Sequence, residues 1–286
     1  MRLLLTIPTI DLRSNRLFTQ SHIINSVNIP VNELENSLYE LPMSSQPIQL
    51  FGLDPEIQQA TKFLLSKNYQ VKESLIANKQ NLLKLEEMEL MTTGKSTDYL
   101  WQPASIVKRF IDEITQKNGN NKGLDIACGA GRDSVYLSIN GWSMTSIDYL
   151  PSALNKLTQL AKKHQQDIQT VQFDLESNNA ELSQFMKLNT ATNQSFNGLF
   201  GCVIVVRYLH RPLLKQLKSL IDVGGYIVYQ TFMQGCEVFG SPKNPRYLLK
   251  PGELAREFSD FSIVIDEVIT LDDGRPTNCF IAQRIK

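Results

Sequence analysis

One short stretch constrains the fold of this chain more than any other: Asp125-Ile126-Ala127-Cys128-Gly129-Ala130-Gly131-Arg132-Asp133. An apolar run typical of a buried strand ends in two glycines spaced by one residue, and a helical pattern begins directly after them. Gly129 and Gly131 allow the backbone to turn tightly and to approach a ligand closely. The amides at the start of the helix then point toward that ligand. The stretch therefore predicts a strand, a ligand-binding loop and a helix in succession.

Acidic residues follow at the ends of the next predicted strands. Asp148 stands at the end of the second strand, where a carboxylate can accept both hydroxyls of an adenosine ribose. A nicotinamide dinucleotide is the competing ligand, but Ser134 replaces the third glycine of its G-x-G-x-x-G motif. Asp125 also places a negative charge beside the loop, which disfavours a pyrophosphate and suits a ligand with an ammonium and a sulfonium. The ordinary alternatives are an exposed turn aspartate at Asp148 and, at Asp174, an aspartate of the kind common after strands.

The second half of the chain alternates strands with helices. We expect strands at 124–128, 143–148, 168–173, 201–206 and 226–232, helices at 106–114, 132–139, 151–164 and 212–221, and a surface excursion at 177–197. Such alternation predicts a doubly wound sheet with helices on both faces. Residues 262–269 and 278–284 have no helix between them, so they predict an antiparallel hairpin that turns at Asp272-Asp273-Gly274.

Residues 99–286 resemble a class I S-adenosylmethionine-dependent methyltransferase, most closely the small tellurite-resistance type. The resemblance rests on the glycine stretch, on Tyr208-Leu209-His210-Arg211-Pro212 and on residues 244–254. It implies a seven-stranded, Rossmann-like doubly wound sheet with an antiparallel C-terminal hairpin, and S-adenosyl-L-methionine as the cofactor. It also implies a small-molecule methyl acceptor, such as a chalcogen or thiol compound, while RNA or protein stays open.

The same resemblance implies roles for individual residues. Asp125, Gly129 and Gly131 would hold the methionine part of the cofactor. Asp148 would bind the ribose, and Asp174 would face the adenine amino group. The remaining expected cofactor contacts are Ala127, Arg132, Tyr149 and Leu175.

The segment after the fourth strand is the expected acceptor side. Methyl transfer from a sulfonium is an in-line displacement, so the protein has to align the nucleophile and exclude water. We expect Tyr208 to align the nucleophile, His210 to accept a proton, and Arg207 to pair with an anionic acceptor. The alternatives are a helix-start role for His210 and a neighbouring carboxylate as the partner of Arg207. Residues 234–250 predict either a lid or a solvated loop, with basic residues at Lys243, Arg246 and Lys250.

Residues 1–75 predict a separate small α/β unit, and residues 76–98 predict a linker helix and a turn. Residues 10–73 resemble a rhodanese-like domain, on Ile10-Asp11-Leu12-Arg13 and on residues 21–30. Active members carry a cysteine directly after the central strand, where this chain has Gly52, and without a thiol no persulfide forms. We therefore expect a rhodanese-like domain without sulfur transfer, with a docking or dimerisation role and with a structural His22.

Charge and cysteine usage narrow the function classes. The 29 Lys+Arg and 29 Asp+Glu residues of this 286-residue chain cancel, which argues against broad binding to nucleic acid or anionic lipid. Four distant cysteines without a C-x-x-C pair fit neither a disulfide scaffold nor a zinc site, so we expect no metal and a cytoplasmic location. No apolar run approaches the ~20 residues of a membrane span. The second functional hypothesis is a non-catalytic binding protein in which both domains have lost their chemistry.

Overall fold

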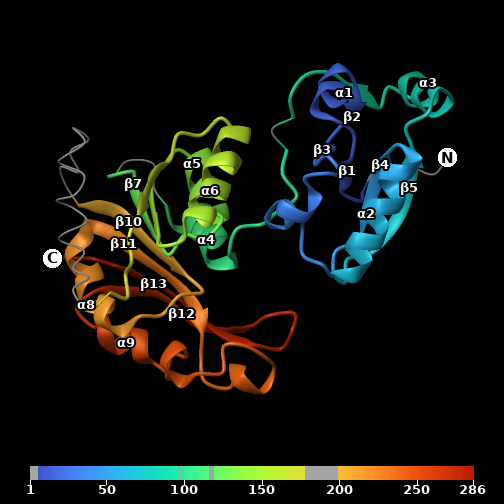
Figure 1. Ribbon diagram of the computed structural model, residues 1–286. Helices are drawn as coiled ribbons and strands as arrows, with labels where there is room; N and C mark the ends of the chain where they lie inside the picture. Colours follow the sequence, from blue (N-terminus) through green and yellow to red (C-terminus); the bar gives the residue numbers. More distant parts are fainter. Residues whose placement is uncertain (1–5, 97, 116–118, 178–198) are drawn as a thin grey trace. The chain divides into compact units, whose positions relative to one another are not determined.

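The computed structural model describes residues 6–96, 98–115, 119–177 and 199–286. The chain divides into two compact units, Met1–Gln102 and Pro103–Lys286 (Figure 1). The first unit includes residues 76–96, which the sequence suggested as a linker. There, α3 (Lys79–Glu87) buries Leu85 in a cluster with Ile23 and Phe51, and β6 (Met91–Thr92) pairs with β2 (His22–Ile23). Leu85 of this helix is thus covered by its own unit, whereas Leu83 is exposed.

The first unit is built on a parallel sheet with the strand order β3-β1-β4-β5. Its strands are β1 (Thr9–Asp11), β3 (Val27–Asn28), β4 (Ile48–Gly52) and β5 (Val71–Ile76). Helix α2 (Asp54–Ser66) buries Ile57, Ala60 and Leu64, as its apolar spacing predicts. The other short elements are α1 (Asn15–Gln20) and the 3-10 turns Leu34–Asn36 and Leu38–Glu40.

The second unit is built on a mixed sheet with the order β12-β13-β11-β10-β7-β8-β9. Its strands are β7 (Lys122–Ile126), β8 (Ser143–Asp148), β9 (Gln169–Gln172), β10 (Phe200–Val206), β11 (Ile221–Phe232), β12 (Ser262–Thr270) and β13 (Pro276–Gln283). The first five are parallel, and β13 runs antiparallel to both β11 and β12. The α/β architecture and the antiparallel C-terminal hairpin are therefore confirmed.

Helices cover both faces of this sheet (Figure 1). Helices α4 (Ser105–Arg109), α5 (Arg132–Ile139) and α6 (Pro151–Lys163) lie on one face, and α8 (Arg211–Leu220) and α9 (Glu253–Glu257) lie on the other. Helix α4 continues into the π-helical segment Phe110–Ile114, and the 3-10 turns Cys236–Val238 and Pro245–Tyr247 follow β11. Among the described residues, no helix is long and apolar enough to cross a membrane.

The strand order places a ligand site at one edge of the sheet. Strands β7 and β10 are neighbours, with Val205 paired to Ile126. From β7 the chain adds β8 on one side, whereas from β10 it adds β11 on the other, so the order reverses between β7 and β10. Ligands of open α/β sheets bind outside the carboxyl ends of the strands at such a point.

Some boundaries differ from the sequence-based expectation. Strand β7 ends at Ile126 rather than at Cys128, because Ala127 adopts a left-handed backbone with φ of 57°. Strand β11 begins at Ile221 rather than at Tyr226, because Ile221 pairs with Phe200. The excursion expected at 177–197 lies outside the described residues beyond Ser177.

Candidate active site

The loop between β7 and α5 crosses the carboxyl edge of the sheet in a left-handed path. The φ angles of Ala127, Gly129 and Gly131 are 57°, 56° and 79°. Two backbone hydrogen bonds fix the path: Cys128 N–H donates to the Ile147 carbonyl oxygen at 3.0 Å, and Gly131 N–H donates to the Cys128 carbonyl oxygen at 3.0 Å. The loop is therefore held to β8 and closed on itself before α5 begins.

The two glycines of the loop serve different purposes. A Cβ atom on Gly129 would have no heavy atom within 4 Å, so the backbone is open there to a ligand. A Cβ atom on Gly131 would lie 2.3 Å from Cγ of Leu157 on α6. Gly131 thus allows α6 to pack closely against the start of α5, and any contact that it makes with a ligand stays a prediction.

Asp148 bonds the glycine loop through one carboxylate oxygen and the turn between β8 and α6 through the other. Its Oδ2 accepts the N–H of Gly129 at 2.9 Å, and its Oδ1 accepts the N–H of Leu150 at 2.9 Å. The side chain is buried, with a residue exposure of 7%, which excludes an exposed turn aspartate. Each oxygen keeps a further lone pair for a hydroxyl donor. The neighbouring Tyr149 is exposed.

Asp125 is a buried carboxylate supported by serines. The Ser134 hydroxyl donates to Asp125 Oδ2, and the Ser146 hydroxyl donates to Ser134 Oγ at 2.8 Å. Ser134 occupies the position of the missing third glycine, so this substitution provides the hydrogen-bond partner of the carboxylate. Burial raises the pKa of Asp125 well above its ordinary value, and the charges of Asp133 and Asp148 raise it further. The site therefore favours a positively charged group next to Asp125.

The raised pKa of Asp125 leads to a stability prediction for the ligand-free protein. The folded protein binds this proton more tightly than the unfolded chain, so stability falls as the pH rises from the unfolded pKa toward the folded one. Asp125→Asn stays neutral and can still accept the Ser134 hydrogen bond. We expect this variant to have a higher melting temperature than the wild type near pH 8. The rise should be roughly 2–4 °C if the free energy of unfolding increases by about 1 kcal/mol. The difference should shrink toward about pH 4, near the unfolded pKa.

The control for this prediction is the exposed Asp174, since Asp174→Asn should not change the melting temperature in the same way. Calorimetric melting curves across the pH range measure the effect. A lower melting temperature of Asp125→Asn at the higher pH would contradict the assignment of a destabilising buried charge.

The segment after β9 contributes one exposed carboxylate and one buried side chain. Asp174 Oδ1 accepts the N–H of Glu176 at 2.9 Å, which forms a local turn at the sheet edge. The expected neighbour Leu175 is only 5% exposed, and its side chain packs in the main core with Ile126. If Leu175 contacts a ligand, it does so through its backbone.

The side-chain hydroxyl of Tyr208 is a buried polar group at this edge of the sheet. It has no hydrogen-bond partner among the residues that the structure describes. Burial raises the pKa of Tyr208 above its ordinary value, and the charges of Glu176, Asp174 and Asp148 add to the effect. A buried hydroxyl without a partner is costly, so the arrangement points to a ligand that supplies the missing hydrogen bond.

The two other residues expected on the acceptor side flank Tyr208. Arg207 has a φ of 56°, and its N–H donates to the Gln230 carbonyl oxygen at 2.7 Å. His210 stands at the N-cap of α8, but it donates no side-chain capping bond, and in the described part of the chain its ring makes no hydrogen bond. His210 therefore lies at the helix start, and its ring is available to a ligand.

Arg211 and Glu253 fasten the loop that the sequence suggested as a lid. Arg211 Nε donates to Glu253 Oε1 at 2.6 Å, and its two terminal nitrogens donate to the carbonyl oxygens of Arg246 and Leu248 at 2.7 and 2.8 Å. Arg246 itself pairs with Glu176 at 3.2 Å. Sequence analysis missed these contacts because no local pattern signals a pair 42 residues apart. The segment 246–248 is thus held against the start of α8.

Cysteine chemistry is not favoured at this edge. Cys236, in the loop after β11, is fully buried. Burial raises the pKa of the half-buried Cys128 thiol, and the negative charges of Asp125 and Asp148 raise it further. Neither thiol is therefore a ready nucleophile.

Known proteins are similar to this chain over different shares of its length. An uncharacterized protein of Schizosaccharomyces pombe, UNK4.09, is 24% identical over 98% of this chain and 94% of its own length. A protein of Haemophilus influenzae called probable S-adenosyl-L-methionine-dependent methyltransferase TehB is 29% identical over 109 residues, which cover 37% of this chain and 34% of that protein. The crystal structure of TehB from Haemophilus influenzae superposes with a TM-score of 0.48 at 20% identity and covers 64% of this chain and 62% of that one.

A family model identifies the second unit. The model described as "Tellurite resistance protein TehB" matches residues 104–268, which include the glycine loop, Asp148, Tyr208 and the segment fastened by Arg211. The match spans more than half of the 286 residues. This protein therefore belongs to the TehB tellurite resistance protein family.

Proposed function

We propose that this protein is an S-adenosylmethionine-dependent methyltransferase that acts on a small-molecule acceptor. The observation that carries the proposal is the open backbone at Gly129, whose N–H is bonded to the buried carboxylate of Asp148 and which follows the strand that carries the buried Asp125. A ligand with a ribose and a positively charged amino-acid part fits this donor and acceptor set. Membership of the TehB family and the printed name of the Haemophilus relative support the same activity.

The residues of the loop would divide the cofactor between them. Asp148 accepts the ribose hydroxyls with its remaining lone pairs, and Asp125 faces the ammonium and the sulfonium. Asp174 and Tyr149 lie toward the adenine, where Leu175 offers its backbone. Ala127, Gly129, Gly131 and Arg132 line the methionine part. The cofactor, when bound, supplies a methyl group on a positively charged sulfur that is a good leaving group.

The acceptor would bind beside β10. The Tyr208 hydroxyl has no partner among the described residues, so a hydrogen bond to the acceptor would orient its nucleophilic atom. The His210 ring is available to take up a proton where the acceptor is protonated. Arg207, at the same edge, would attract an anionic part of the acceptor. The fastened segment 246–248 would help to exclude water from this side.

Titration calorimetry with S-adenosylhomocysteine tests the cofactor assignment. We expect a single site on the full chain, and a folded protein that gives no binding heat and no melting shift would sink the proposal. Labelled methyl transfer from S-adenosylmethionine into a fractionated lysate then tests turnover and identifies the product. Binding without transfer to any fraction would favour the alternative, a non-catalytic binding or regulatory protein.

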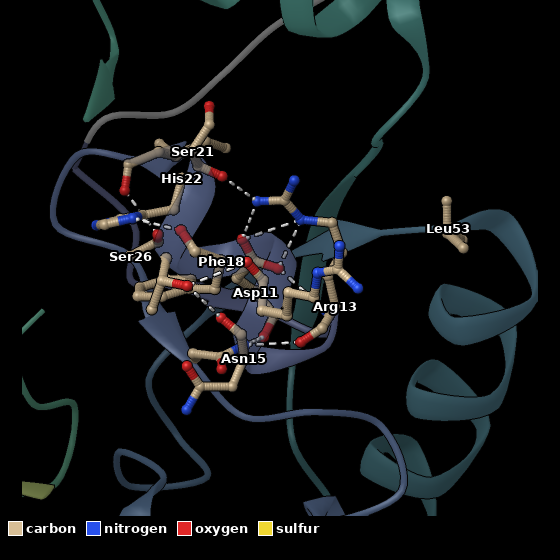
Figure 2. Close-up of polar contacts among 12 residues, drawn as sticks. Asp11, Arg13, Asn15, Phe18, Ser21, His22, Ser26 and Leu53 are labelled. Carbon is tan, nitrogen blue, oxygen red and sulfur yellow. Dashed lines mark hydrogen bonds and ion pairs between the residues drawn. The ribbon is translucent and has the colours of Figure 1, made fainter. Parts of the chain in front are cut away.

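For the first unit we propose an inactive rhodanese-like module that serves docking or dimerisation. Asp11 and Arg13 form a buried ion pair at 2.6 Å, and Arg13 also donates to the Ser21 carbonyl oxygen at 2.7 Å (Figure 2). His22 is buried, stacks on Phe18 and bonds its carbonyl oxygen, which supports a structural role. Strand β4 ends at Gly52, which offers no thiol, and Glu56 Oε2 accepts the N–H of the next residue, Leu53. Four cysteines without a disulfide support the proposed cytoplasmic location.

A further inference from the structure

The carboxyl group of Asp125 is buried without an ion-pair partner. Asp125 lies in β7 and is only 2% exposed. In the part of the chain that the structure describes, its carboxyl group forms no salt bridge, and its one hydrogen bond comes from Ser134 of α5. Burial of an ionised carboxylate without a counter-ion is costly, whereas burial of a neutral carboxyl group that is hydrogen-bonded costs far less. The surroundings of Asp125 therefore favour its protonated form.

The titratable groups near Asp125 do not offset this cost. Burial raises the pKa of Asp125, and the negative charges of Asp133 on α5 and Asp148 on β8 raise it further. The other titratable neighbours are the thiols of Cys128 in the glycine loop and Cys202 on β10. Burial raises the pKa of both thiols, and the charge of Asp125 adds to the effect, so both stay neutral. These neighbours thus supply no positive charge to the carboxyl group.

Two buried serines form a hydrogen-bonded chain that ends on this carboxyl group. The Ser134 hydroxyl donates to Asp125 Oδ2, and the Ser146 hydroxyl donates to Ser134 Oγ at 2.8 Å. Ser146 is the residue of β8 that pairs with Asp125 in the sheet, and both serines are 0% exposed. The chain therefore joins β7, α5 and β8 in the interior, where its hydroxyls bond each other and Asp125 rather than solvent.

Such a chain supports both protonation states of the carboxyl group. A hydroxyl has one hydrogen to donate and two lone pairs, and it rotates to suit its partners. When Asp125 is ionised, Ser146 donates to Ser134, and Ser134 donates to the carboxylate. When Asp125 is protonated, the carboxyl group donates to Ser134 Oγ, and Ser134 donates to Ser146 Oγ. The reversal keeps every hydrogen bond of the chain, so the proton can leave or return without a change of fold.

We propose that Asp125 is protonated in the ligand-free protein and loses this proton when a positively charged ligand binds, while the chain of Ser134 and Ser146 reverses its direction. The O–H bond of the carboxyl group breaks, its electron pair stays on Asp125, and the proton goes to the solvent. The inference rests on the proposed methyltransferase function, because the ammonium group of the cofactor is the expected positive charge. It makes cofactor binding dependent on pH: affinity rises with pH until Asp125 is already ionised in the ligand-free protein.

Titration calorimetry of the full chain in buffers of different ionisation enthalpy counts the released protons. The probes are S-adenosylhomocysteine and methylthioadenosine, which has the adenosine part but no ammonium group. Below the pKa of the ligand's own ammonium group, we expect S-adenosylhomocysteine to release about one proton more than methylthioadenosine. Asp125→Asn should remove this difference, and its affinity for S-adenosylhomocysteine should no longer rise with pH, because an amide is neutral like the protonated carboxyl group.

The two serines should shift the ionisation of ligand-free Asp125 in opposite directions. Ser134→Ala removes a hydrogen bond to the carboxylate, which is stronger than a bond to the neutral group, so the pH of ionisation should rise. Ser146→Ala removes the acceptor that the Ser134 hydroxyl needs only in the protonated state, so this pH should fall. We expect each shift to be roughly one pH unit. Difference infrared spectroscopy follows the carbonyl stretch of the protonated carboxyl group, with Asp125→Asn as the reference that assigns the band.

Ser138→Ala is the matched control. Ser138 lies on the same helix and bonds Gln166 Oε1 at 2.9 Å, so its substitution should change neither the proton count nor the infrared titration. A wild-type proton count in Asp125→Asn, or shifts of both chain serines in the same direction, would overturn the proposal. If the wild type binds neither nucleoside, the methyltransferase function fails, and the infrared titration of the ligand-free protein decides the proposal. Opposite serine shifts then support the reversible chain, and the absence of an Asp125 band at neutral pH overturns it.

Discussion

Gly131→Ala should lower the free energy of unfolding of the second unit by about 2–5 kcal/mol. The new Cβ atom would lie 2.3 Å from Cγ and 2.8 Å from Cβ of Leu157, and a contact so near the backbone of α6 cannot be relieved by a side-chain rotation alone. The φ of 79° adds the cost of a left-handed residue with a side chain. Chemical denaturation of the full chain, followed by the transition of the second unit, measures the loss.

Gly129→Ala is the matched control for this substitution. It introduces the same methyl group at a similar φ of 56°, but the space around it is open. It should therefore lower the free energy of unfolding only by the cost of a left-handed backbone with a side chain, about 1–2 kcal/mol. In a double-mutant cycle, Leu157→Ala should also recover part of the loss from Gly131→Ala, because it removes the atoms in collision. Equal losses at the two glycines would show that packing against α6 is not the reason for Gly131.

Asp148→Ala should weaken S-adenosylhomocysteine binding by about 1–3 kcal/mol, which corresponds to roughly 5- to 150-fold in the dissociation constant. The substitution removes the proposed acceptor of the ribose hydroxyls. It also leaves the N–H groups of Gly129 and Leu150 without the bonds at 2.9 Å that shape the loop. Titration calorimetry measures the affinity, and the melting temperature of the ligand-free variant separately measures the structural part.

The comparison for Asp148 is Asp174→Ala. Asp174 is exposed and its carboxylate holds only a local turn, so the loss of affinity should be smaller and the ligand-free melting temperature nearly unchanged. An Asp148→Ala variant that binds S-adenosylhomocysteine as tightly as the wild type would remove Asp148 from the proposed site, even if it melts at a lower temperature.

The sequence predicted the features of the second unit that local patterns encode. Apolar periodicity predicted α5 and β8. The β12–β13 hairpin was predicted because no helical pattern stands between residues 262–269 and 278–284. Asp148 and Tyr208 were expected at the site from their places at the end of a strand or after one, where topology brings side chains to one sheet edge. The structure has Asp148 at the end of β8 and Tyr208 after β10, and their roles toward a ligand stay predictions.

The features that were missed depend on contacts between distant segments. Nothing near Gly131 in the sequence announces that Leu157 of α6 will lie against it. The pair of Arg211 and Glu253 spans 42 residues, and the amide of Ala104 meets Asp133 across 29. The early end of β7 depends on Ala127, a residue type that rarely adopts a left-handed backbone and so gives no warning.

The two hydrogen bonds of Asp148 bear on the kinetics of ligand capture. The amide of Gly129 in the glycine loop and the amide of Leu150 in the turn after β8 are already bonded to the carboxylate that is proposed to bind the ribose. A loop that has its final shape before the ligand arrives loses little conformational entropy on binding. Association should then proceed in one step, at a rate set by diffusion and orientation rather than by a slow rearrangement of the loop.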